Sequence, residues 1–191
     1  MVLGILYFIG FVKNSKAYKA FTLYLLCIGL IQVVSYFYGR GWLRESNLFL
    51  SSYYFISQFI LLSLFYYYLL KKSSIKYILY SVLGLLCIQY FVQPNVFVEY
   101  NPIGITVTQI ILVIYSVYYF YISLSGKRDF IISNIAIFFY LLSSTLIFAS
   151  GNLVLDLEIS KTTRFILINV NRVLIVLFQG MVLVDWFRLR K

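Results

Sequence analysis

Long apolar stretches that alternate with short basic gaps constrain this chain more than any other feature of its sequence. A membrane-spanning helix needs about 20 mostly apolar residues. Six stretches meet this requirement: Ala17–Tyr38, Asn47–Leu70, Ile75–Gln93, Ile103–Leu124, Phe130–Ser150 and Arg164–Phe187. The opening run, Met1–Val12, is also apolar, but it reaches only about 18 Å as a helix. The pattern predicts an all-α polytopic transmembrane helical bundle of seven helices, the first one short, in a single domain over residues 1–191.

The composition excludes an ordinary soluble domain. Hydrophobic residues make up 62% of the chain and charged residues 12%, with a mean hydropathy of +0.91, whereas about a quarter of the residues in soluble domains are charged. The net charge of +10 would suggest nucleic acid as a partner of a soluble protein. Here the cations lie in short gaps beside apolar stretches, where they act as an orientation signal. We therefore expect the lipid bilayer as a partner, no nucleic acid, and a multi-pass location in a membrane.

The basic residues orient the predicted bundle. Every second gap and the tail carry most of them: Lys13, Lys16, Lys19, Lys71, Lys72, Lys76, Lys127, Arg128, Arg188, Arg190 and Lys191. Because cytoplasmic loops attract the excess of Lys and Arg, these gaps are predicted to be cytoplasmic. The N-terminus is then outside and the C-terminus inside. Tyr and Trp residues near both ends of the stretches fit the two aromatic belts of a membrane protein.

Polar side chains inside the stretches are concentrated in the halves that this orientation places outside. Polar groups within a membrane are costly unless they are paired, so the asymmetry indicates a polar cavity that opens outward. Its candidate ligand-binding residues are Arg172, Asn169, Gln58, Gln32, Gln89 and Gln109. The same side chains can instead join helices through modest hydrogen bonds, and both interpretations stay open.

Arg172 is the most informative of these residues. It lies about 12 Å into the last stretch, where an ionisable side chain usually faces the bundle interior and a partner. The acids on the predicted outer side are Glu45, Glu99, Asp156 and Glu158. We expect Arg172 either to pair with one of them or to bind the carboxylate or phosphate of a ligand. At the other end of the same stretch, Asp185 is expected to form an ion pair with Arg188.

Catalytic and metal-binding motifs are missing from the sequence. The chain has no His, which removes the commonest acid–base group and metal ligand. It also has no Gly-rich phosphate loop. Its two cysteines, Cys27 and Cys87, lie inside apolar stretches, where packing explains them. We therefore expect no enzyme activity, no metal and no cofactor.

Three segments carry a resemblance to a known family. They are Asn47–Phe59 with Leu61–Ser63 and Phe65–Tyr68, Ile9–Phe11 before the first Lys cluster, and Ser150–Asn152 before an Asn-rich last helix. In these motifs the chain resembles an uncharacterised family of small bacterial seven-helix integral membrane proteins. The resemblance covers most of the chain and implies the same architecture and a location in a bacterial inner membrane, without an established activity. Where that family often has a His and a Glu on the third helix, this chain has Ser52 and Gln58.

The sequence favours a ligand-sensing or accessory signalling component that acts through a cytoplasmic or membrane partner, either a kinase or the subunits of a complex. The predicted cytoplasmic loops are only a few residues long, so a signal would pass to another polypeptide through helix movement. The alternatives are a small-molecule transporter or channel subunit, and a structural subunit of a larger membrane complex.

Overall fold

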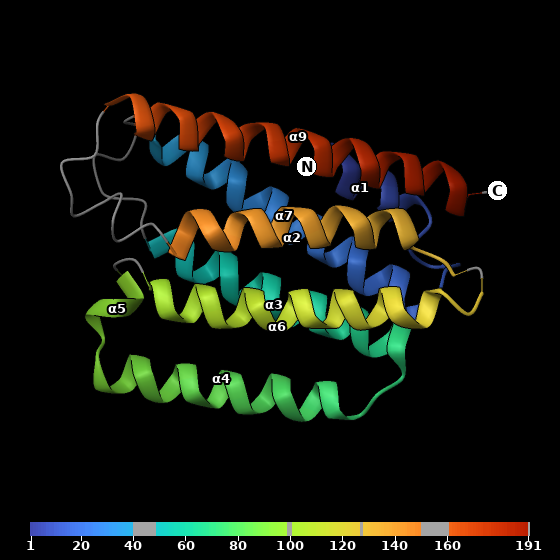
Figure 1. Cartoon of the computed structure of the whole chain (residues 1–191), viewed down its shortest axis with the longest axis horizontal. Helices are drawn as coiled ribbons and strands as arrows, with labels where there is room; N and C mark the ends of the chain where they lie inside the picture. Colours follow the sequence, from blue (N-terminus) through green and yellow to red (C-terminus); the bar gives the residue numbers. More distant parts are fainter. Residues whose placement is uncertain (40–48, 99–100, 127, 150–160, 191) are drawn as a thin grey trace. The chain divides into compact units, whose positions relative to one another are not determined.

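The part of the chain that the computed structural model describes, residues 1–39, 49–98, 101–126, 128–149 and 161–190, consists of α-helices and short connections (Figure 1). The helices are α1 (Val2–Ile9), α2 (Lys16–Gly39), α3 (Phe49–Leu70), α4 (Ser74–Val92), α5 (Asn95–Val98), α6 (Pro102–Ser123), α7 (Ile131–Ala149) and α9 (Lys161–Leu189). No strand occurs among these described residues.

Each apolar stretch of the sequence coincides with one of these helices. Five helical segments of the described chain are long and apolar enough to cross a membrane: Lys16–Tyr38, Phe49–Leu70, Ser74–Val92, Pro102–Ser123 and Asn169–Leu189. The all-α and multi-pass parts of the prediction are thereby confirmed. The total of seven membrane helices and their direction across the membrane stay predictions.

Contacts between the helices divide the chain into two compact units. Unit 1 is Met1–Asn101 and unit 2 is Pro102–Lys191. In unit 1, α1 packs on α2, α2 on α3 and α3 on α4, while α5 contacts both α3 and α4. In unit 2, α7 packs between α6 and α9. The prediction of a single domain over the whole chain is not tested by this division.

Aromatic side chains form the core of unit 1. The rings of Tyr7 and Phe21 lie 5.5 Å apart, and those of Phe21 and Phe65 lie 5.0 Å apart. All three side chains are fully buried, so the short helix α1 is tied to α2 and α3 through one continuous cluster. Ser15, the last residue before α2, caps this helix. Its hydroxyl accepts a hydrogen bond of 3.2 Å from the Tyr18 amide. This is the usual way in which a Ser starts a helix.

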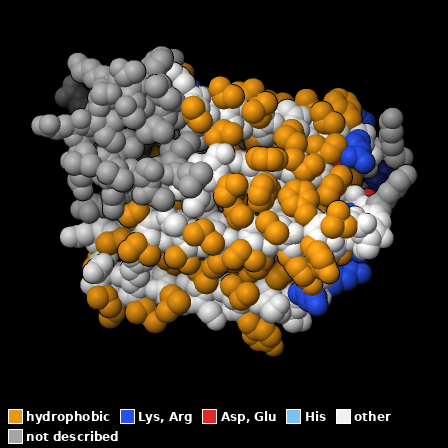
Figure 2. All heavy atoms as spheres, in the orientation of Figure 1, with side chains coloured by type: hydrophobic (Ala, Val, Ile, Leu, Met, Phe, Trp, Pro, Cys, Tyr) orange, Lys and Arg blue, Asp and Glu red, His pale blue; other side chains and the backbone are white. Residues whose placement is uncertain are grey.

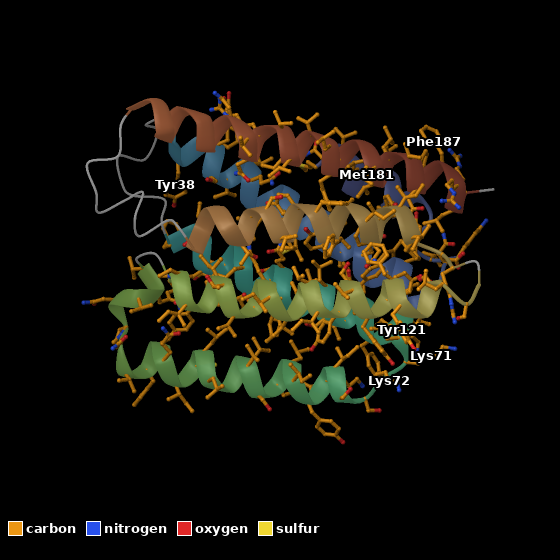
Figure 3. The ribbon with its side chains drawn as sticks, viewed as in Figure 1. Tyr38, Lys71, Lys72, Tyr121, Met181 and Phe187 are labelled. Carbon is orange, nitrogen blue, oxygen red and sulfur yellow. The ribbon has the colours of Figure 1, made fainter. Side chains whose placement is uncertain are left out.

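Branched aliphatic and aromatic side chains from all three helices fill the core of unit 2. Its buried members include Leu112, Ile137, Leu141, Val182 and Trp186. Figure 3 shows Met181 on the side of α9 towards α7 and Phe187 turned away from it. Phe187 is 57% exposed, which suits a helix face that meets lipid.

Basic side chains gather at one end of each unit, which we call its basic end. Neighbouring helices run antiparallel (Figure 1), so the residues before α2 and after α3 share an end of unit 1, and the residues before α7 and at the close of α9 share an end of unit 2. Figure 3 labels Lys71 and Lys72 at the basic end of unit 1. The basic end of unit 1 carries Lys13, Lys16, Lys19, Lys71, Lys72 and Lys76, and that of unit 2 carries Arg128, Arg188 and Arg190.

Apolar side chains are numerous on the helix flanks that face the viewer in Figure 2. Phe91 of α4 and Leu124 after α6 are among the most exposed, at 88% and 85%. Such flanks would be unfavourable in water, because contiguous exposed apolar surface of this extent is rare in soluble monomers. Apolar flanks with cations at the ends are what a bilayer requires of the helices that it surrounds.

Candidate functional site

The most complete polar contact of unit 2 joins α6 to α7 in the half away from the basic end. Gln109 is 1% exposed, and its amide nitrogen donates to the Ser144 hydroxyl at 3.4 Å. Its amide oxygen accepts from the Thr145 hydroxyl at 2.9 Å. That hydroxyl also lies 2.7 Å from the carbonyl oxygen of Leu141 one turn earlier. Both ends of the Gln109 amide are therefore engaged within the helix pair.

A second polar pair joins the same two helices nearer the basic end. The Ser116 hydroxyl donates to the side-chain oxygen of Asn134 at 3.0 Å, and the Asn134 amide donates back to the Ser116 carbonyl at 3.2 Å. Ser116 lies two turns after Gln109, so both side chains occupy one face of α6. Both Ser116 and Asn134 are fully buried. The α6–α7 interface thus carries two separate hydrogen-bonded contacts along its length.

Helix α7 is joined to α9 by a buried carboxylate. Asp185 of α9 is 2% exposed and accepts hydrogen bonds from the backbone nitrogen of Ser133 at 3.0 Å and from its hydroxyl at 2.6 Å. In the described part of unit 2, Asp185 forms no ion pair, and the expected pairing with Arg188 was wrong. The reason is that Ser133 lies in the first turn of α7, where backbone N–H groups lack partners within the helix and attract a carboxylate.

In unit 1, Gln58 of α3 contacts α2. Its amide nitrogen donates to the Tyr24 hydroxyl at 3.3 Å. Gln58 is 1% exposed, and its amide oxygen has no hydrogen-bond partner among the described residues. A buried acceptor without a partner is costly, so this oxygen, like the buried Ser63 hydroxyl of the same helix, could accept a hydrogen bond from a further donor.

Gln89 of α4 takes part in a cluster that closes the α4–α6 connection. The Asn101 amide donates to the Gln89 side-chain oxygen at 3.2 Å and lies 3.3 Å from the Tyr90 hydroxyl. Asn101 is 1% exposed. The Ser52 hydroxyl donates to the Phe97 carbonyl at 2.9 Å, which holds α5 against α3. The connection between α4 and α6 therefore contains a short helix, α5, that the Ser52 side chain of α3 holds.

Two of the predicted ligand-binding residues lie on the surface of the protein. Gln32 of α2 and Arg172 of α9 are exposed, and Asn169 is half-buried. Among the described residues, Arg172 forms no ion pair. The four candidate acids lie outside the described residues: Glu45, Glu99, Asp156 and Glu158.

The six candidates divide between the two units. Gln32, Gln58 and Gln89 belong to unit 1, and Gln109, Asn169 and Arg172 belong to unit 2. Within its unit, each of Gln58, Gln89 and Gln109 is hydrogen-bonded to another side chain. A cavity that combines residues of both units stays a prediction.

Sequence reasoning did not single out the contacts of Ser133, Asn134 and Asn101. Their partners are far away in the sequence, and no spacing rule links Ser133 to Asp185 across 52 positions. One signal was available for Asp185, because a carboxylate inside an apolar stretch needs a partner. In the described residues, no group of three or more His, Cys, Asp or Glu is placed to hold a metal ion.

Long apolar helices with polar contacts between them define this chain as a multi-pass helical membrane protein. In comparisons with protein-family models, curated proteins and solved structures, no match to this chain was found. The resemblance to the family of small bacterial seven-helix proteins therefore stays a prediction.

Proposed function

We propose that this chain is a ligand-sensing or accessory signalling component of a bacterial inner membrane. It would act through a protein partner, a kinase or the subunits of a complex, rather than through a reaction of its own. The observation that carries the proposal is the placement of polar contacts at both ends of α7. Gln109 engages one end of this helix at Thr145, and Asp185 engages the other end at Ser133.

The two contacts are separated by the stiff part of α7. Ser133 and Thr145 are 12 positions apart, which corresponds to about 18 Å along a helix. Hydrogen-bonded helices move as rigid rods, so a ligand that displaces Thr145 from Gln109 shifts the end of α7 that Asp185 caps. A signal then reaches the basic end of unit 2 without unfolding any element.

The direction of signalling follows from the charges. Positive residues favour the cytoplasmic side, so the basic ends are assigned to the cytoplasm, and the N-terminus to the outside. The half of unit 2 with Gln109 then faces outward, in reach of an external ligand. Arg172, exposed on α9, supplies a cation with which a carboxylate or phosphate group of that ligand can pair.

The partner is proposed to bind at the basic ends. The connections there are short: α3 and α4 are separated by Lys71–Ser73, and α6 ends only a few residues before α7 begins. Such connections offer a contact surface but no room for an output domain between these helices. The proposal therefore assigns the output to a partner polypeptide.

The experiment is photo-crosslinking in intact membranes. A crosslinking amino acid is placed at Ser73 or Gly126 at the basic ends, and at Asn95 beyond α4 as the opposite-side control. The proposal expects Ser73 or Gly126, but not Asn95, to capture a protein with a soluble output domain. The yield should change in Gln109→Leu, which breaks the contact with α7. It should not change in Gln179→Leu, the same substitution at an exposed position of α9.

Other outcomes would favour the alternatives. Capture of the same large complex at constant yield in both Leu variants would favour a structural subunit and contradict sensing. Solute uptake by vesicles that contain the purified chain, abolished by Gln109→Leu, would favour a transporter or channel subunit.

A further inference from the structure

A pocket of about 390 Å³ opens at the basic end of unit 2. Its lining comes from the end of α6, the α6–α7 connection, the start of α7 and the end of α9: Ser123, Gly126, Arg128, Asp129, Ile131 and Arg188. This volume lies within the range of about 300–1,000 Å³ that is usual for small-molecule sites. None of these residues takes part in the hydrogen bonds of Gln109 and Asp185 on which the proposed function rests, and the pocket lies at the end of unit 2 where the partner is proposed to bind.

The charge of the pocket favours an anion. The lining contains two residues with a guanidinium group, Arg128 and Arg188, and one with a carboxylate, Asp129. Among the described residues, neither arginine lies within ion-pair distance of an acid. An arginine presents a planar set of donors that matches the oxygens of phosphate, and two arginines can grip one phosphate from two directions.

The connection that carries Arg128 is held in place by its neighbours. The Tyr119 hydroxyl donates to the backbone carbonyl of Asp129. The next residue, Phe130, is 3% exposed and has a φ of 62°. A bulky residue adopts this left-handed backbone only where its surroundings fix it. Arg128 therefore extends from a connection that is anchored directly after it.

The attraction for an anion arises from the arginines rather than from the helix end. The first turn of α7 is the positive end of that helix, but Asp185 already occupies it through Ser133. A third cation at this end, Arg190, lies over the Trp186 ring at 5.1 Å and does not line the pocket. The pocket thus has its own pair of cations, and a matched cation beside it serves as a control.

The geometry points to a binding site for a phosphate-bearing anion at the basic end of unit 2, held by Arg128 and Arg188. Basic pockets between membrane helices near the cytoplasmic face commonly hold the headgroups of anionic lipids. A free phosphate compound from solution offers the same chemistry. The shared ligand group is the phosphate, and the experiment separates the two sources.

The test uses the full chain in vesicles of phosphatidylcholine, alone or mixed with phosphatidylglycerol. Native mass spectrometry after extraction counts the phosphatidylglycerol molecules that stay bound. In a second arm, inorganic phosphate is added to the chain in phosphatidylcholine alone, and the midpoint of thermal unfolding is compared with that in chloride at equal ionic strength. The variants are Arg128→Gln, Arg188→Gln and both together, with Arg190→Gln as the control.

Loss of both arginines should weaken retention about tenfold or more, because each removes a charge-assisted hydrogen bond to phosphate. Arg190→Gln should stay close to the unaltered chain. Selective loss in the lipid arm assigns the site to a headgroup, and selective loss of stabilisation in the phosphate arm assigns it to a free phosphate compound. Equal lipid retention in all variants, with no effect of phosphate, would overturn the proposal.

Arg128→Lys distinguishes a loss of phosphate binding from a folding defect in the double variant, because it keeps the charge and loses the planar donor set. Retention between those of the unaltered chain and Arg128→Gln supports phosphate recognition by a guanidinium. Retention in Arg128→Lys equal to that in Arg190→Gln would reduce the effect to surface charge and contradict a built site.

Discussion

Asp185 of α9 caps the first turn of α7 by accepting two hydrogen bonds from Ser133, at 3.0 Å from the backbone nitrogen and at 2.6 Å from the hydroxyl. A carboxylate usually caps its own helix from the preceding residue. Here the residue before α7 is Phe130, which has no capping oxygen, and the acid comes from a neighbouring helix instead. The helix end and the helix–helix interface therefore depend on one side chain.

The first prediction concerns Asp185→Ala. The substitution leaves both buried donors of Ser133 without an acceptor, so we expect a loss of about 1–3 kcal/mol in the free energy of unfolding. Asp185→Asn keeps one oxygen acceptor and should lose less. Ser133→Ala removes only the hydroxyl and should also lose less. Reversible unfolding in mixed micelles measures the free energy of unfolding of the three variants. An Asp185→Ala variant as stable as the unaltered chain would show that the cap contributes nothing.

The second prediction is a coupling between Gln109 and Thr145. In a double-mutant cycle with Gln109→Leu and Thr145→Val, the coupling free energy should be about 0.6 kcal/mol and no more than about 1.7 kcal/mol, the range measured for hydrogen bonds between membrane helices. The control cycle pairs Gln109→Leu with Ser116→Ala. The two positions are about 10 Å apart along α6, so their effects should add. Equal coupling in both cycles would contradict a direct contact between Gln109 and Thr145.

The third prediction compares two glycines. A Cβ on Gly4 of α1 would lie 2.8 Å from Leu26 Cδ2 and 3.0 Å from the Leu26 backbone nitrogen, whereas a Cβ on Gly84 of α4 meets nothing within 4 Å. Small residues allow such close helix packing in membranes. Gly4→Ala should therefore lower the thermal unfolding midpoint by separating α1 from α2. Gly84→Ala should leave it unchanged or raise it, because Ala favours helix by about 1 kcal/mol. A higher unfolding midpoint in both variants would show that α1 does not need its close approach to α2.

The positions of the helices follow from the sequence more directly than their contacts do. The stretch Ala17–Tyr38 was predicted, and α2 covers Lys16–Gly39. The length of an apolar run is a property of that run alone, so it can be read without a partner. The contact of Gln109 with Thr145 depends on the rotation of two helices about their axes, and a polar residue in a single sequence does not report that rotation. The short helix α5 escaped prediction for a related reason, because Ser52 of α3 holds it from outside the loop.

The fourth prediction concerns the direction of the chain in the membrane. With Cys27 and Cys87 replaced by Ala, a membrane-impermeant thiol reagent should label Asn95→Cys in intact cells and should not label Ser73→Cys. Both positions are exposed, so accessibility within the protein does not distinguish them. Ser73→Cys should react once the cells are opened. Labelling of Ser73→Cys from outside would reverse the orientation and would remove the cytoplasmic assignment of the basic ends.

The last prediction concerns Arg172. A guanidinium near the middle of a membrane helix costs about 2.5–3.5 kcal/mol on insertion scales, and Arg172 is exposed on α9 without an ion pair among the described residues. Arg172→Leu should therefore preserve or raise the free energy of unfolding, because it removes the cost together with the charge.

If Arg172 binds the anionic group of a ligand, Arg172→Leu should abolish the change in partner crosslinking that the ligand causes, while folding stays intact. Arg172→Lys should restore that response only weakly, because a lysine lacks the planar donors that grip a carboxylate or phosphate. Gln179→Leu is the matched control, since it places the same side chain at another exposed position of α9. A normal response in Arg172→Leu would contradict the ligand-binding role. A strong loss of stability would instead indicate that Arg172 pairs with one of the outer acids, since that acid would then lose its counter-ion.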